Sequence, residues 1–172
     1  DKAKVLIIGG GAIGILCALI LQNIKKNSHT TLVEINEKRL DVCKKSLQSQ
    51  VLNPESDKIK NNSFDFVIDA VGNEKTRQFA IKSTKPGGAI VHVGLTDAGG
   101  SFDFRKTTLQ EITFIGTYCY TFRDFNKTIK ILSKSLIGDL NWIQYKDLKN
   151  GSEAFKQIHD GTCASPKIIL IP

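Results

Sequence analysis

Three glycines at positions 9, 11 and 14 constrain the fold more than any other feature of the chain. They lie in VLIIGGGAIGILCALIL (residues 5–21), between a short apolar run that predicts a buried strand and a longer one that predicts an apolar helix. The spacing G-x-G-x-x-G is a weak signal by itself, because it occurs by chance in many chains. At a strand-to-helix junction, however, it is typical of a loop that binds the phosphates of a dinucleotide.

Each glycine has a separate role in such a loop. Gly9 permits the tight turn, Gly11 leaves the backbone open to a pyrophosphate, and Gly14 lets the helix pack closely against the strand. The backbone amides of Ala12 and Ile13, at the helix N-terminus, would point at the phosphates with the helix dipole behind them. We therefore expect these five residues to form the phosphate end of a cofactor site.

A carboxylate at the expected distance supports the same interpretation. Glu34 lies about 20 residues beyond Gly14. There it could accept both hydroxyls of the adenosine ribose and repel a 2′-phosphate, which favours NAD over NADP. The alternative for Glu34 is a surface acid that merely ends a strand. Arg39 could lie over the same ribose, or it could form an exposed ion pair with Glu37 or Asp41.

Apolar strand patterns alternate with helix patterns along the chain, and this alternation predicts an α/β fold with a doubly wound parallel sheet. We expect six strands in the order 3-2-1-4-5-6. The predicted strands are 4–10, 30–35, 51–53, 64–72, 89–95 and 112–118, followed by a last strand at 167–171. The predicted helices are 11–25, 36–47, 73–84, 121–136 and 151–161, with a turn at 85–88.

Two further strands end in a glycine, in the segments DAVGN and HVGL. Ligands of open parallel sheets bind beyond the carboxyl ends of the strands. The backbone at Val71 and Gly72, and at Val93, Gly94 and Leu95, is therefore expected near the ribose and nicotinamide. The alternative is that these glycines only turn the chain.

Taken in order, VLIIGGGAIG, LVEINEKRLDVCKKS, FDFVIDAVGN, KPGGAIVHVGL and ITFIGTY resemble the coenzyme-binding, C-terminal domain of medium-chain zinc-dependent alcohol and polyol dehydrogenases. The resemblance covers nearly the whole chain. It implies an NAD-dependent oxidoreductase that transfers a hydride between an alcohol carbon and nicotinamide in the intact enzyme. The substrate would be a small alcohol or polyol, and the isolated chain would bind NAD without turning over substrate.

The resemblance also implies roles for particular residues. Glu34 would hold the ribose, with Arg39 as a supporting contact, and Cys119 would act through its backbone rather than as a nucleophile. Lys167 would reach the pyrophosphate, although a solvated lysine is an equal alternative. The main chain would contact the nicotinamide half at Ala70, Val71, Gly72, Val93, Gly94, Leu95, Thr117 and Cys119.

The family holds its catalytic zinc in an N-terminal domain, whereas this sequence begins just before the first cofactor strand. His29, His92 and His159 show no ligand spacing, so we expect no metal site in this chain and zinc only in a domain that is missing here. We expect a NAD-binding domain at 1–137 and a C-terminal tail at 138–172 that would pack toward the missing domain. The segment ESDKIKNNS leaves room for one or two helical turns before the fourth strand.

Composition restricts the partners and the compartment. The net charge is +7, but the lysines are scattered and do not alternate with aromatic residues, so we expect no nucleic-acid partner. No apolar run is long enough for a membrane span. The four cysteines form no C-x-x-C pair, which favours reduced thiols and a cytoplasmic location.

The apolar edge strand at 112–118 predicts pairing across a two-fold axis, and the resemblance likewise implies a homodimer through this edge. Two other functions share much of the pattern. One is a zinc-independent quinone reductase, whose deciding residues would lie outside this sequence. The other is an S-adenosylmethionine-dependent methyltransferase, whose loop usually lacks the G-x-G-x-x-G spacing.

Overall fold

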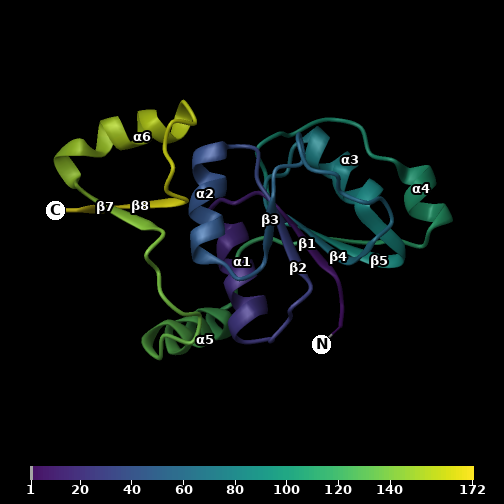
Figure 1. Cartoon of the computed structure of the whole chain (residues 1–172), viewed down its shortest axis with the longest axis horizontal. Helices are drawn as coiled ribbons and strands as arrows, with labels where there is room; N and C mark the ends of the chain where they lie inside the picture. Colours follow the sequence, from purple (N-terminus) through teal and green to yellow (C-terminus); the bar gives the residue numbers. More distant parts are fainter. Residues whose placement is uncertain (1) are drawn as a thin grey trace.

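Six parallel strands form the central sheet of the computed structural model, in the order β3-β2-β1-β4-β5-β6 (Figure 1). The structure describes residues 2–172. The sheet strands are β1 (Val5–Ile8), β2 (Thr30–Val33), β3 (Gln50–Leu52), β4 (Phe64–Asp69), β5 (Thr84–His92) and β6 (Thr113–Gly116). The helices between and after them are α1 (Ala12–Asn23), α2 (Glu37–Ser46), α3 (Glu74–Ser83), α4 (Phe104–Leu109) and α5 (Phe122–Ser133). The predicted fold class and strand order are confirmed.

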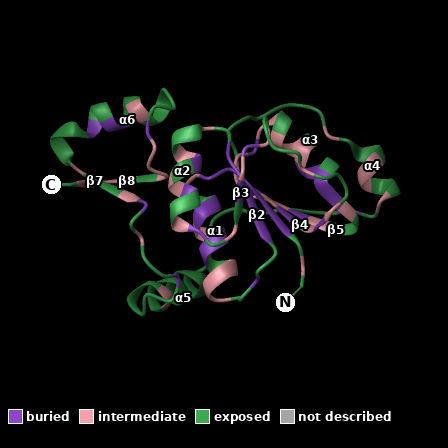
Figure 2. Ribbon diagram, viewed as in Figure 1, coloured by how far each residue is buried: buried purple, intermediate pink, exposed green. Residues whose placement is uncertain are grey.

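Helices cover both faces of this sheet because its strands are apolar on both sides. In β1, Val5 and Ile7 pack into the core beside α1 and α2, whereas Leu6 and Ile8 pack into the core beside α3. Figure 2 shows the buried residues concentrated in the central strands and on the inward sides of α1 and α3.

Strand register brings three chain segments together at one edge of the sheet. Ile8, the last residue of β1, is paired with Val33 of β2 on one side and with Asp69 of β4 on the other. The glycine-rich bend, Glu34 and the segment after Asp69 therefore leave the sheet side by side. This is the carboxyl end, where ligands of open parallel sheets bind.

Polar side chains cap the helices that follow β2 and β4. Asn36 accepts a hydrogen bond from the backbone amide of Arg39, and Asn73 forms a capping box with Thr76. The predicted helix starts at these two asparagines are confirmed.

The structure departs from the predicted elements at the turn predicted at 85–88 and at α4. The turn predicted at 85–88 lies inside β5, where the β4–β5 register shifts between Phe64 and Phe66. Helix α4 was not predicted, because its six residues are too few to show a periodic pattern. Residues 53–63 contain no helix, but the Asp57 amide donates to the Asn53 carbonyl at 2.7 Å and closes a single helical turn, in keeping with the one or two turns expected there.

The C-terminal residues form a small second sheet beside α2 (Figure 1). It pairs β7 (Ile143–Asp147) with β8 (Lys167–Ile171), and the chain between them holds the 3₁₀ helix η1 (Leu148–Asn150) and α6 (Gly151–His159). Trp142 and Ile137 are buried in the core beside α1 and α2, so the junction between α5 and the small sheet is anchored on the main sheet's own core. Among residues 2–172, no helix is long and apolar enough to cross a membrane.

Candidate functional site

The bend between β1 and α1 has the geometry that its three glycines predict. Gly9 has a φ of 98° and donates its amide to the Val33 carbonyl at 2.8 Å. A Cβ on Gly14 would overlap the carbonyl oxygen of Gly9, so only glycine fits where α1 approaches the bend. A Cβ on Gly11 would meet no atom within 4 Å. Gly11 therefore faces open space, while Gly14 is required by packing.

The N-terminus of α1 is open to a ligand. Gly11 is the N-cap residue, no side chain caps the helix, and its first turn, which includes Ala12 and Ile13, contains no acidic residue. The first amides of a helix have no acceptor within the helix and attract anions. This helix end therefore keeps its donors for a group that approaches from outside.

Glu34 ties the end of β2 to the glycine-rich bend. Its Oε2 accepts the Gly10 amide at 2.8 Å, and its Oε1 accepts the Asn36 amide at 2.8 Å. The Glu34 side chain is only 5% exposed. An ionised carboxylate offers about four acceptor positions, so these two hydrogen bonds leave capacity for two further donors.

Arg39 pairs with Glu34, and not with Glu37 or Asp41. Its Nη1 lies 3.5 Å from Oε2 of Glu34, and its Nε is buried without a partner in the described part of the chain. The pair places a positively charged guanidinium beside the carboxylate at the end of β2.

Cys43 fills the space behind the bend. Its Sγ lies 3.7 Å from the Gly10 carbonyl oxygen, and a Cβ on Gly10 would come within 2.8 Å of that sulfur. Burial, together with the nearby Glu34 carboxylate, raises the pKa of the Cys43 thiol to about 12. The thiol is therefore neutral and inert, and Cys43 acts as packing beneath the loop.

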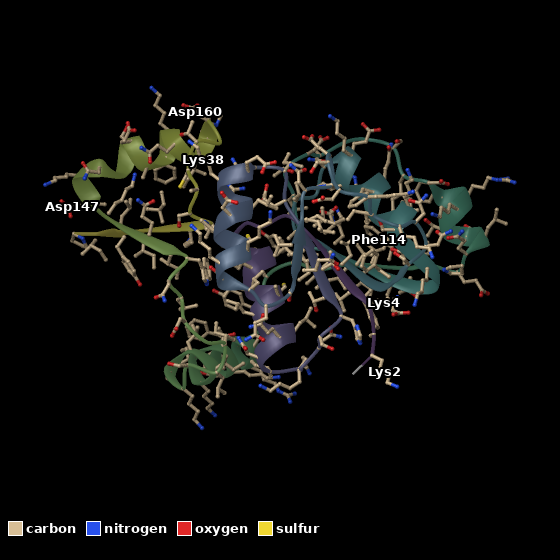
Figure 3. The ribbon with its side chains drawn as sticks, in the orientation of Figure 1. Lys2, Lys4, Lys38, Phe114, Asp147 and Asp160 are labelled. Atoms are coloured by element: carbon tan, nitrogen blue, oxygen red, sulfur yellow. The ribbon has the colours of Figure 1, made fainter. Side chains whose placement is uncertain are left out.

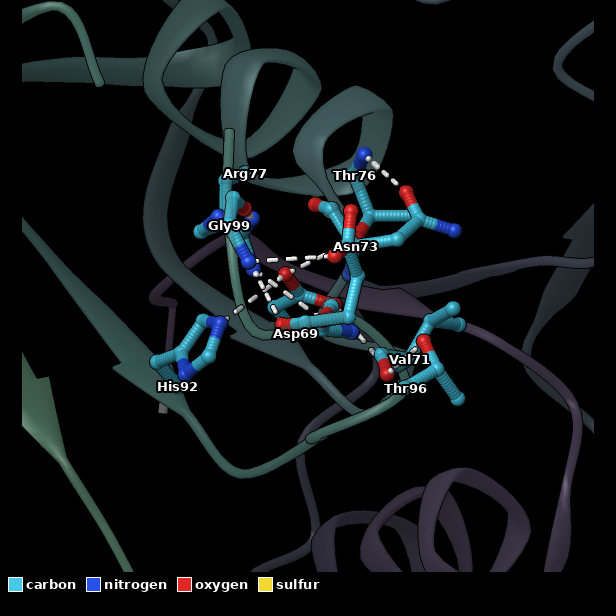
Figure 4. Close-up of polar contacts among 10 residues, drawn as sticks. Asp69, Val71, Asn73, Thr76, Arg77, His92, Thr96 and Gly99 are labelled. Carbon is cyan, nitrogen blue, oxygen red and sulfur yellow. Dashed lines mark hydrogen bonds and ion pairs between the residues drawn. The ribbon is translucent and has the colours of Figure 1, made fainter. Parts of the chain in front are cut away.

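A second carboxylate, Asp69, organises the neighbouring strand end (Figure 4). Its Oδ1 accepts the amides of Val71 and Gly72, at 3.0 and 2.9 Å, and its Oδ2 accepts the Thr76 hydroxyl at 3.0 Å. The Asp69 backbone carbonyl accepts the amides of Val93 and Gly94. This one fully buried residue therefore holds the chain ends that leave β4 and β5.

These two chain ends touch through their glycines. A Cβ on Gly72 would overlap the Gly94 carbonyl, and a Cβ on Gly94 would overlap the backbone of Val71. Because Asp69 already holds the amides of Val71, Gly72, Val93 and Gly94, a ligand here would meet backbone carbonyls and the Leu95 amide rather than these four amides. Both glycines are needed for close approach, so they do more than turn the chain.

Of the remaining predicted site residues, Ala70 adjoins this network, whereas Thr117, Cys119 and Lys167 lie outside it. Thr117 follows β6 and donates its amide to the His92 carbonyl at 2.9 Å, which places it at the same end of the sheet. Cys119 is exposed, with a φ of 52°, and no hydrogen bond joins it to the bend in the described part of the chain. Lys167 is exposed at the start of β8, and none of its hydrogen bonds reaches the bend. Ala70 donates its amide to the Ile8 carbonyl beside the bend.

An apolar pocket of about 260 Å³ opens beside Glu34. Ile8, Val33, Val71 and Phe79 line it, together with Gly9 of the bend. A flat aromatic group could enter between these side chains while a polar group attached to it reached Glu34.

Sequence reasoning missed Gly10, Asp69 and His92. The available signal for Asp69 was an acidic residue at the last position of a largely apolar strand, three residues before a glycine. His92 Nε2 is buried 3.7 Å from Asp69 Oδ2, without a hydrogen-bond partner in residues 2–172. Within the same residues, no cluster of three or more His, Cys, Asp or Glu side chains is arranged to hold a metal ion.

The family model for zinc-binding dehydrogenases matches residues 12–134, so the chain belongs to this family. The family predicted from the sequence, and with it the dehydrogenase class, is confirmed. Membership favours this class over a methyltransferase.

Curated relatives and solved structures resemble the chain along nearly its whole length. The chain is 24% identical over 171 residues to probable D-xylulose reductase A of Aspergillus clavatus, covering 92% of this chain and 48% of the relative. It is 24% identical over 176 residues to L-threonine 3-dehydrogenase of Pseudoalteromonas atlantica, covering 96% and 51%. Acetophenone reductase from Geotrichum candidum, solved with NAD, has a TM-score of 0.83 at 24% identity, covering 95% of this chain and 47% of that one. The chain thus spans about half the length of the relatives it matches.

The geometry of the bend predicts very different losses of stability for two glycine-to-alanine substitutions. Gly14→Ala forces a Cβ into the Gly9 carbonyl and should lower the free energy of unfolding by about 3 kcal/mol. Gly11→Ala places its Cβ in open space at a φ of −70°, so its cost should stay below about 1 kcal/mol. Urea unfolding followed by circular dichroism measures both values, and equal losses would contradict the geometry described for the bend.

Proposed function

We propose that this chain is the NAD(H)-binding domain of a zinc-type dehydrogenase that acts on an alcohol or polyol. The observation that carries the proposal is the open bend at Gly9–Gly14. No side chain caps the N-terminus of α1 there, and a Cβ added to Gly11 would meet no atom within 4 Å. The free amides at Ala12 and Ile13 would bind the pyrophosphate, and the open face of Gly11 would let it approach. Lys167 would add a positive charge near the same phosphates.

The carboxylate of Glu34 would hold the adenosine ribose. Its acceptor capacity beyond the Gly10 and Asn36 amides suits two ribose hydroxyls, and the apolar pocket beside it suits the adenine ring. A 2′-phosphate would bring a second negative charge beside a nearly buried carboxylate, which supports NAD over NADP. Arg39, held 3.5 Å from that carboxylate, would cover the ribose from the side of α2.

The ends of β4, β5 and β6 would position the nicotinamide half. Asp69 holds Ala70–Gly72 against Val93–Leu95, and Thr117 is bonded to the end of β5. The carbonyls of these segments, the Leu95 amide and the backbone at Cys119 would contact the carboxamide and orient one face of the ring. When bound, NAD supplies the hydride-transferring group, and this chain supplies its orientation.

The rest of the intact enzyme would complete the reaction. The names of the relatives describe reduction of D-xylulose or oxidation of L-threonine at its third carbon, which supports a carbonyl–alcohol interconversion. Zinc would be held by a part of the protein outside this chain, and residues 138–172 would pack toward that part. Four thiols without a disulfide support a cytoplasmic location.

The edge strand β6 supports a homodimer. It pairs with β5 on one side only, and all four of its residues are exposed, including Phe114 and Ile115. Tyr118 and Tyr120, which follow β6 in the chain, are also exposed. An apolar edge of this kind pairs readily with a second copy across a two-fold axis.

The coenzyme proposal predicts selective binding by the isolated chain. Isothermal titration should show saturable binding of NAD⁺ and at least about tenfold weaker binding of NADP⁺. Gly11→Ala should weaken NAD⁺ binding at least about tenfold, because its Cβ occupies the phosphate approach. The matched control Gly99→Ala, whose Cβ also meets no atom within 4 Å, should leave the affinity unchanged. Tighter binding of S-adenosylmethionine than of NAD⁺ would overturn the proposal.

The dimer proposal predicts that the molecular mass in solution falls to that of a monomer when the edge strand β6 is altered. Light scattering coupled to size exclusion should give a dimer for the natural chain and a monomer for Ile115→Lys, which puts a charge into the paired edge. Ile158→Lys on α6, a residue of similar exposure, should remain dimeric. A natural chain that stays monomeric at high concentration would refute the dimer.

A further inference from the structure

A second pocket, of about 390 Å³, lies at the opposite end of the sheet from the glycine-rich bend. Thr30, Gln50 and Phe64 line it, and they are the first residues of β2, β3 and β4. Because the strands are parallel, their first residues and their carboxyl ends lie at opposite edges of the sheet. The pocket therefore does not overlap the coenzyme site.

The pocket exists because the crossover between β3 and β4 carries no helix. Residues 53–63 run back across the sheet in irregular turns, and Lys58, Ile59 and Lys60 from this crossover line the pocket. Ile59 packs against the core beside α3, which fixes the crossover while both lysines stay exposed. A hollow with positively charged walls replaces the usual helix–sheet contact.

Four basic side chains line this pocket: Lys4, His29, Lys58 and Lys60. Among residues 2–172, no acidic residue lines it and none of the four basic side chains lies within ion-pair distance of a carboxylate. Asp57 and Asp65 are each adjacent in sequence to a lining residue, and the Asp57 carboxylate accepts the Asn53 amide at 2.8 Å. Asp65 follows Phe64 at the rim of the pocket. It is already engaged, because its carboxylate accepts the Lys4 amide and the Lys85 ammonium, each at 2.7 Å.

The location of these charges distinguishes them from ordinary surface lysines. Figure 3 shows Lys4 near the N-terminal end of the sheet, far across the molecule from Asp147 and Asp160 on the C-terminal segment. Three lysines from two parts of the chain, the segment before β1 and the β3–β4 crossover, line one concave site instead of following a helix face. Uncompensated positive charges in a hollow attract and concentrate anions.

The other lining groups indicate the size and shape of the ligand. The hydroxyls of Thr31 and Ser63 can bond an oxyanion or a sugar hydroxyl, and Ile59 and Phe64 offer an apolar floor. A phosphomonoester carries a charge of about −1.5 to −2 near pH 7, whereas a carboxylate carries −1. Three ammonium groups therefore suit a phosphomonoester better than a carboxylate. We propose that this pocket binds a phosphorylated small molecule of about the size of a sugar phosphate.

The proposal is independent of the coenzyme site. A stripe of charge along an open surface would suit a nucleic-acid backbone, whereas these lysines surround a hollow of small-molecule volume. Among residues 2–172, no exposed Phe, Tyr or Trp lines the pocket for base stacking, and its one exposed aromatic ring is the His29 imidazole. A compact phosphate ester fits both the charge and the volume.

Isothermal titration at low salt, with ribose 5-phosphate and inorganic phosphate as probes, tests this inference. Ribose 5-phosphate should bind saturably and more tightly than inorganic phosphate, because the hydroxyls and the apolar floor contact the sugar. The double variant Lys58→Gln/Lys60→Gln should weaken binding at least about tenfold. The matched control Lys149→Gln/Lys156→Gln removes the same charge from exposed residues of the C-terminal segment and should bind normally. Both variants should keep the natural affinity for NAD⁺, which separates this site from the coenzyme site.

Other outcomes would overturn the proposal. An equal loss of affinity for ribose 5-phosphate in both double variants would mean that net charge, and not a site, attracts the ligand. Inorganic phosphate binding as tightly as the ester would exclude recognition of the sugar. An oligonucleotide that displaces ribose 5-phosphate at lower concentration would mean that the surface binds nucleic acid. Circular dichroism should report unchanged folding, because all four substituted lysines are exposed.

Discussion

The 2.8 Å hydrogen bond from the Gly10 amide to Glu34 is the contact on which the arrangement of the coenzyme site depends. It fixes the bend after β1 against the end of β2, and it keeps the Glu34 carboxylate nearly buried. The Glu34 carboxylate thus orients the bend and still has acceptor capacity for a ligand. Cys43 supports the same bend from behind as a neutral thiol.

A parallel arrangement at β4 completes the site. Asp69 holds the chain beyond β4 and the chain beyond β5, so the two halves of the proposed dinucleotide site are each organised by one buried carboxylate at a strand end. These carboxylates accept backbone amides, which makes each network charge-assisted and rigid. A rigid site of this kind binds a ligand without first paying for its own ordering.

Local patterns were enough to predict the bend, the presence of Glu34 at the end of the second strand, the sheet order and the starts of two helices, because each depends on residue types at fixed spacing. The role of Asp69 depends on where β4 ends relative to β5, which is a tertiary relationship. The basic pocket is present because residues 53–63 form no helix and because lysines at positions 4, 58 and 60 line the hollow that remains. Sequence spacing carries no sign of that convergence, so only the folded chain reveals it.

Backbone amide chemical shifts during a titration with NADH test the central claim most directly. In the ¹⁵N-labelled chain, the largest saturable changes should fall on Ala12 and Ile13 at the N-terminus of α1, with smaller ones around Glu34. Changes confined to the β3–β4 crossover or to the C-terminal segment, with Ala12 and Ile13 unmoved, would contradict the assignment of the glycine-rich bend as the phosphate-binding element.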